Sequence, residues 1–163
     1  MSENIKPTPF SDVYSCFFSQ ITDDMYMELD KPQTEALVKE LLLSAIPSFE
    51  FPRQDMFDYN VVDDTFNIEL TQEEKNILAV YMVEKWMGQQ LASIENIRMK
   101  YSGSDFKFTS QANHMQKVLQ LKKDYERLGF HLQRLYKRRK KNKNGIMKST
   151  FGTIMKEVDE NDY

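Results

Sequence analysis

The stretch TQEEKNILAVYMVEKW, residues 71–86, decides how the chain folds. Thr71 and Glu74 have the spacing of a capping box, in which each side chain accepts a hydrogen bond from the other residue's backbone amide. The pattern predicts a helix that begins here and runs to about Lys100, with Gly88 as either a break or a point of close packing. Apolar residues recur at helical spacing along one face, namely Ile77, Leu78, Tyr81, Met82 and Trp86.

Two shorter helices are predicted before it. Ser11 is a candidate N-cap for the first and Asp30 for the second. In the second helix Pro32 fits the first turn and Pro47 marks the end. The predicted core faces carry Val13, Phe17 and Ile21 in the first helix, and Leu37, Leu41, Ala45 and Ile46 in the second.

A long fourth helix is predicted to begin at Thr109 or Ser110. Its length is permitted because no proline follows Pro52. Asparagine and glycine in residues 142–145 indicate where it ends. Its apolar positions are Met115, Val118, Leu119, Tyr125, Leu128, Leu132, Leu135 and Tyr136, and its other face carries Lys117, Lys122, Lys123, Arg127 and Arg134.

The connection at residues 47–70 is rich in aromatic residues and lacks helical spacing. Residues 66–70 (FNIEL) alternate as a short strand does, and Asp63 and Asp64 before them suggest a turn. The connection is therefore either a small hairpin or an extended arm.

These patterns predict an all-α fold: a small helical bundle with two long helices, a short irregular or hairpin-like connection and an extended C-terminal arm. The predicted organisation is a flexible N-terminus at residues 1–10, a helical domain at 11–136, and a basic run with a C-terminal tail at 137–163.

Composition narrows the class of protein. The chain has 163 residues, of which 40% are hydrophobic and 29% charged, as expected for one soluble domain with or without an arm. No apolar stretch approaches the roughly 20 residues of a membrane helix, and residues 1–9 lack the apolar region of a secretory signal. The single cysteine, Cys16, cannot form an internal disulfide and is expected to be a buried, inert thiol.

The sequence offers no motif for catalysis. His114 and His131 are its only histidines and have no metal-binding spacing. Glycine-rich phosphate-binding motifs and the GxSxG nucleophile motif do not occur. We therefore expect no enzymatic activity, no cofactor and no metal, and we interpret Tyr81 and Trp86 as core residues.

Charge is strongly separated along the chain. Residues 1–110 carry 9 Lys or Arg against 19 Asp or Glu, a net of −10, whereas residues 111–148 carry 12 against 2, a net of +10. Residues 149–163 contribute −3, so the total is −3. Such separation predicts that charge guides an encounter with a nucleic acid, an acidic protein or another copy of the chain.

The densest positive charge lies at residues 137–143, where six of seven residues are basic. A solvated helix end is one interpretation, because a helix dipole favours cations there. Neutralising phosphates is another, and it would give binding that depends on salt but not on base sequence. The run lacks interleaved aromatic residues, so a protein partner is as good an interpretation as stable DNA binding.

Two stretches resemble the head-to-tail connector (adaptor) proteins of tailed bacteriophages. They are FNIELTQEEKNILA at residues 66–79, continued by VEKW at 83–86, and SDFKFTSQANH at 104–114. The second is the more specific, because capping boxes occur in many helical proteins. The order of a helical start, a capped helix and an SQANH-like opening of the last helix resembles that family over about residues 10–136.

The resemblance implies a structural protein of the virion neck, present in the host cytoplasm during assembly. Such adaptors are small helical bundles that form a ring, here expected to be a dodecamer, beneath the portal. The ring joins the portal to the downstream neck or tail protein and extends the channel through which genomic DNA passes without specific binding. No membrane is involved.

The C-terminal segments of such adaptors engage the portal. We therefore assign the basic run and the tail to the portal or to a neighbouring subunit. The alternative, based on the basic run alone, is a small helical nucleic-acid-binding or regulatory protein. The assigned partner-binding residues are Lys137, Arg138, Arg139, Lys140, Lys141, Lys143, Phe151 and Ile154.

Overall fold

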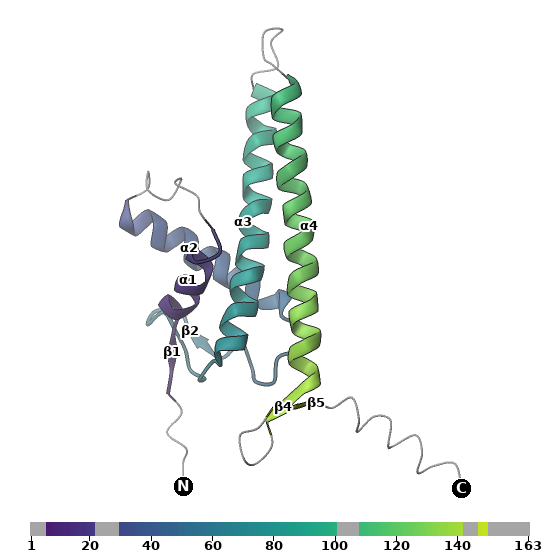
Figure 1. The fold of residues 1–163 in the computed structure, drawn as a ribbon. Coiled ribbons are helices and arrows are strands. Elements are labelled where there is room, and N and C mark those ends of the chain that lie inside the picture. The colour runs from purple at the N-terminus through teal and green to yellow at the C-terminus, as the bar shows by residue number, and fades with distance from the viewer. Residues whose placement is uncertain (1–5, 22–29, 101–107, 142–146, 150–163) are drawn as a thin grey trace, which may run out of the picture.

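Among the residues that the computed structural model describes there are four α-helices: α1 (Phe10–Phe18), α2 (Lys31–Ala45), α3 (Gln72–Lys100) and α4 (Phe108–Arg138). The short 3-10 helix η2 (Ile46–Ser48) follows α2 directly. The two long helices, α3 and α4, lie side by side as an antiparallel hairpin, and α1 and α2 pack against the first half of α3 (Figure 1). This arrangement confirms the predicted small helical bundle with two long helices. The structure describes residues 6–21, 30–100, 108–141 and 147–149.

A small antiparallel sheet closes the base of the bundle. Its strands are β1 (Thr8–Pro9), β2 (Tyr59–Asn60) and β3 (Thr65–Phe66), in the order β1-β3-β2. The predicted hairpin is therefore present between β2 and β3, and its turn contains Asp64, whose φ is 53°. β1 lies in the N-terminal segment that the sequence predicts to be flexible.

The strand is shorter than the five residues predicted at 66–70. Beyond β3, the Asn67 amide donates to the Asp58 carbonyl at 3.0 Å, and the Leu70 amide donates to the Thr8 hydroxyl at 2.8 Å. A loop carbonyl and a side-chain hydroxyl thus take the place of backbone partners in a strand, so the ladder ends at Phe66.

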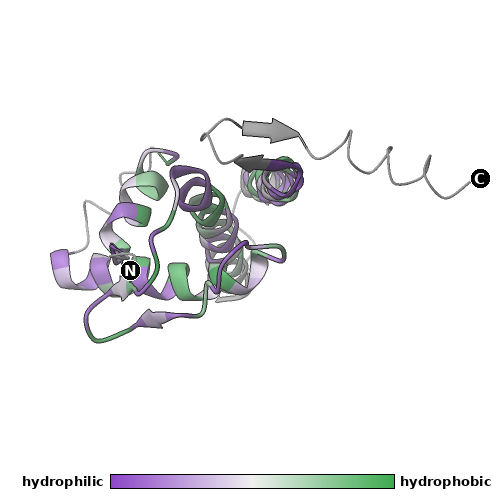
Figure 2. Ribbon diagram, turned by 90° about the horizontal axis from the view of Figure 1, so that it is seen from below, coloured by the Kyte–Doolittle hydropathy of each residue, from purple (hydrophilic) through white to green (hydrophobic). Residues whose placement is uncertain are grey.

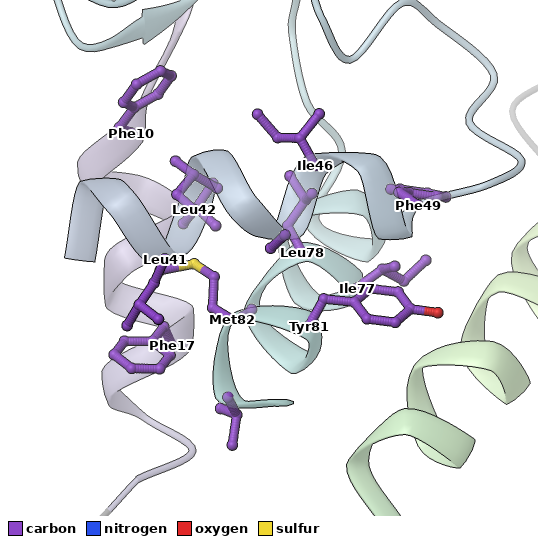
Figure 3. Packing of buried hydrophobic residues seen from close by; sticks show 14 of the residues in the cluster. Phe10, Phe17, Leu41, Leu42, Ile46, Phe49, Ile77, Leu78, Tyr81 and Met82 are labelled. Atoms are coloured by element: carbon purple, nitrogen blue, oxygen red, sulfur yellow. The ribbon is translucent and has the colours of Figure 1, made fainter. Parts of the chain in front are cut away.

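The core lies where α1 and α2 meet α3 (Figure 3). The hydrophobic faces predicted for these helices are buried there, with Ile21 and Leu37 at the half-buried edge. Burying one large apolar side chain contributes about 1.5–3 kcal/mol, so this cluster is the main source of stability in the lower half of the bundle. The fully buried members include Phe10, Val13, Phe17, Leu41, Leu42, Ile77, Leu78 and Met82.

Two of the three predicted helix caps, Asp30 for α2 and Thr71 for α3, are correct. The Gln33 amide donates to the Asp30 carboxylate at 3.0 Å, which caps α2. The prediction for Ser11 is wrong, because α1 already begins at Phe10 and has no side-chain cap. The Phe10 amide instead donates to the Asp64 carbonyl at 2.8 Å, so the β2–β3 turn satisfies the start of the helix.

Helix α4 ends earlier than predicted. It stops at Arg138, and β4 (Arg139–Lys141) then pairs antiparallel with β5 (Met147–Ser149). The backbone of residues 139–141 thus bonds across a hairpin instead of along a helix. Lys143, Phe151 and Ile154 lie outside the described residues.

Two glycines face the α3–α4 contact, and they differ in the space around them. Gly88 does not break α3, and a Cβ at this position would lie 3.5 Å from the Lys122 Cε atom, an ordinary contact. A Cβ at Gly129 in α4 would lie only 2.7 Å from the Tyr81 Cζ atom. The Tyr81 ring is buried and its hydroxyl accepts a hydrogen bond from Gln133, so it has little room to move.

We predict opposite effects of alanine at these two glycines. Gly129→Ala should lower the free energy of unfolding by about 1–3 kcal/mol, because the added methyl overpacks the helix contact. Gly88→Ala should raise it by about 0.5–1 kcal/mol, because alanine is the better helix former and has room. Urea denaturation of both variants tests this, and stabilisation by Gly129→Ala would contradict the close approach to Tyr81.

Candidate interaction surface

The end of α4 is fixed to the start of α3 by a buried carboxylate. Glu74 is only 2% exposed and belongs to the capping box: its own amide donates to the Thr71 hydroxyl at 3.3 Å, and the Thr71 amide donates to its carboxylate at 2.7 Å. The Gln54 side chain donates to the same carboxylate oxygen as the Thr71 amide, at 3.0 Å. The Tyr136 hydroxyl of α4 donates to the other oxygen. One residue therefore caps α3 and holds the last turns of α4.

Tyr136 in turn organises the loop beneath the helices. Its hydroxyl accepts a hydrogen bond from the Arg53 amide at 3.2 Å, and its ring stacks under the Arg53 guanidinium at 3.9 Å. The same guanidinium donates to the carbonyls of Tyr136 and Arg139, which are left without helical partners at the end of α4. Burial, together with the hydrogen bond and charge of Glu74, raises the pKa of Tyr136, so this phenol stays protonated at neutral pH.

Gln133 makes a second link between α4 and the same loop. Its side chain is buried and accepts a hydrogen bond from the Glu50 amide at 2.8 Å, while its amide group donates to the Ser48 carbonyl at 2.9 Å and to the Tyr81 hydroxyl. Every polar atom of this side chain is thus used, which specifies one register of α4 against the loop. No local pattern in the sequence indicates this role, because these partners lie more than 50 residues away.

The basic run begins at the end of α4, which the contacts of Tyr136 and Gln133 hold in place. Two of its residues contact the rest of the fold. The Lys137 Nζ atom lies 4.4 Å from the centre of the Phe51 ring, and Arg139 forms an ion pair with Glu73 at 3.2 Å. Arg138 is exposed at the end of α4. Lys140 and Lys141 continue in β4, so the five described members of the predicted site lie in succession from the helix end into the hairpin.

A buried ion pair joins α3 and α4 further up the hairpin. Glu84 is buried in α3 and pairs with Lys122 of α4 and with Lys85 at 2.9 Å. Burial acts to raise the pKa of Glu84, but the hydrogen bonds and charges of the two lysines outweigh it and leave the pKa lowered. Lys122 was predicted on the solvent face, and the correction is that it points to α3.

The outward face of α4 is covered by no other described element. Leu119 and Leu128 were predicted in the apolar face, but they are 43% and 42% exposed, because α4 packs on α3 alone for most of its length. Phe130, which the sequence did not single out, is 48% exposed. An open groove on this face is lined by Lys123, Glu126, Arg127, Phe130, His131 and Arg134.

The cysteine, the two histidines and the aromatic residues that the sequence singles out form no metal-binding cluster among the described residues. Trp86 and Tyr81 are buried as predicted, whereas Cys16 is half-buried and its sulfur accepts a hydrogen bond from Gln72 at 3.3 Å. Both histidines are exposed on α4. Among the described residues, no three His, Cys, Asp or Glu side chains are placed to hold a metal ion.

The chain matches no protein family, curated protein or solved structure. Within the described ranges, no helix is both long enough and apolar enough to cross a membrane. The interpretation of this surface therefore depends on its own geometry: a C-terminal end of α4 that is held in place, a basic run, and an uncovered helix face that combines cationic and apolar side chains.

We predict that Tyr136→Phe lowers the free energy of unfolding by about 1–3 kcal/mol, because it removes a hydrogen-bond donor from a buried carboxylate and an acceptor from the Arg53 amide. The matched control is Tyr59→Phe, since the Tyr59 hydroxyl makes no hydrogen bond with any described residue. Chemical denaturation measures both. Equal stabilities of the two variants would show that the Glu74 link adds nothing.

The Glu84 pair predicts a specific dependence on pH. A carboxylate whose pKa is lower in the folded state stabilises the protein at a pH above the group's ordinary pKa of 4.5. This contribution disappears as the pH falls through the pKa of the folded state. The native chain should therefore lose more stability between about pH 7 and pH 3 than Glu84→Gln does. Parallel stability curves for the two proteins would contradict a lowered pKa.

Proposed function

We propose that this chain is a structural protein of the neck of a tailed bacteriophage, where copies form a ring that joins the portal to the next neck or tail protein. The observation that carries the proposal is the uncovered outward face of α4, which combines exposed Leu119 and Phe130 with basic side chains. A helix with this composition has reason to be packed against a neighbouring protein.

The shape of the molecule supports the same proposal. The 29 residues of α3 span about 44 Å, and α4 lies beside α3 along most of this length (Figure 1). The end of α4 is held to the start of α3 by the Glu74 hydrogen bond, and to the loop after α2 by the Gln133 hydrogen bonds. Such a rigid rod suits the wall of a channel, and the acidic body would not grip DNA that passes along it.

The basic run supports contact with the portal or with a neighbouring subunit. Arg138 is exposed at the helix end, and Lys140 and Lys141 follow in the β4–β5 hairpin that extends beyond the bundle. Because Lys137 and Arg139 already contact Phe51 and Glu73, the run is held at a defined place at the foot of the molecule. Positive charge at a fixed place favours docking on an acidic surface.

The alternative function is nucleic-acid binding or regulation through the basic run at residues 137–143, to which the basic face of α4 would add. Lys123, Arg127 and Arg134 provide positive charge on one side of the helix. Exposed Leu119 and Phe130 on the same helix argue against it, because a phosphate backbone would leave these apolar side chains uncovered. A protein partner would bury both kinds of side chain.

The proposal predicts that the chain is a stoichiometric component of virus particles. In a nuclease-treated lysate of cells that make it naturally, it should sediment with virus-sized particles at about twelve copies each, the number that a ring on a dodecameric portal requires. Quantitative mass spectrometry of the gradient fractions measures this.

Host ribosomal proteins in the same fractions provide the control for large assemblies that are not viral. Recovery of the chain only as a small species would overturn the neck function. Steeply salt-dependent affinity for duplex DNA would then favour the alternative.

A further inference from the structure

The β2–β3 hairpin presents an apolar and acidic tip. Val61 and Val62, between the two strands, are 44% and 91% exposed, although turns at such positions usually carry polar residues or glycine. Asp63 is exposed beside them, and Asp64 follows. We call Val61, Val62 and Asp63 the hairpin tip.

The hairpin tip is held rigidly. The Asn60 side chain accepts a hydrogen bond from the Val62 amide at 2.9 Å, which fixes the turn. Lys39 of α2 donates to the Val61 carbonyl at 2.7 Å and pairs with Asp64 at 2.5 Å. The two valines are thus presented to solvent in one conformation, which lowers the entropy cost of binding a partner.

The outward face of α4 has the complementary character. Phe130 is half exposed at the centre of the groove residues, and the Arg134 guanidinium lies 6.0 Å from its ring centre. Lys123 and Arg127 add positive charge, against one acidic groove residue, Glu126. The groove can therefore cover apolar side chains while its rim attracts aspartates.

The two surfaces face away from each other in the same molecule. The sheet, α1 and α2 lie on one side of α3, and α4 lies on the other, in both views (Figures 1 and 2). The hairpin tip of one copy therefore cannot reach its own α4 groove, but it can reach that of a second copy. A contact between two different surfaces repeats head to tail, and it gives a ring when the rotation closes.

We propose that the hairpin tip of one copy binds the outward face of α4 of the next copy. Val62 contacts Phe130, and Asp63 faces Arg127 and Lys123. This inference deepens the proposed function, on which it rests, by naming the contact between neighbouring subunits of the ring.

Disulfide trapping between two different full-length variants tests the contact. Val62→Cys and Phe130→Cys are each prepared with Cys16→Ala, mixed in equal amounts and oxidised. The expected result is a covalent dimer that contains one chain of each kind, at a yield about tenfold above that of either variant oxidised alone. Val62 is 91% exposed and Phe130 is 48% exposed, so folding is expected to be preserved and is checked by circular dichroism.

Two further variants make the result specific. Glu40→Cys, at an exposed position on α2, replaces Val62→Cys in the matched control mixture, which should give only the background yield. Adding Arg127→Glu to the Phe130→Cys chain should reduce the mixed dimer several-fold, because Asp63 of the tip then faces a negative charge.

The outcomes separate this contact from the neck function. A mixed dimer no more abundant than in the control mixture would overturn the contact, even if the native chain is present on particles at about twelve copies. A strong mixed dimer from a chain that is absent from particles would keep the contact and reject the neck function. Lower DNA affinity of Arg127→Glu, without any mixed dimer, would assign the α4 face to nucleic acid.

Discussion

The fold depends on one buried carboxylate that serves two helices. Glu74 completes the capping box at the start of α3 and accepts a hydrogen bond from the Tyr136 hydroxyl near the end of α4. A buried charge without partners would be strongly destabilising, but here four donors surround it. The open end of a long helical hairpin is thereby closed. Because Tyr136 is followed directly by the basic run, the same link fixes where the positive charge is presented.

Local signals in the sequence predict most of the fold. The capping box, the Asp30 cap and the periodicity of α3 depend on residues within a few positions of each other, and all three are found in the structure. The position of the α4 leucines was not predictable in this way. Periodicity identifies an apolar face but not how many neighbours cover it, so Leu119 and Leu128 were expected in a core that α3 alone is too narrow to provide.

The candidate site was predictable by charge but not by geometry. Counting residues was enough to identify the basic run, whereas its contacts with Phe51 and Glu73 join segments more than 60 residues apart. The same holds for Gly129, whose lack of a side chain is required only because the Tyr81 ring lies against it. The sequence predicts a turn at Asp63 and Asp64 but does not single out Val61 or Val62, since the exposure of Val62 depends on how the turn folds.

The central claim is that the uncovered face of α4 is buried between copies of the chain in a ring at a phage neck. Electron cryomicroscopy of virus particles from cells that make the chain tests it most directly. The account predicts a ring of paired long helices below the portal, in which α4 of each copy contacts the β2–β3 hairpin of its neighbour. A neck whose density fits no copy of the α3–α4 hairpin would contradict the account.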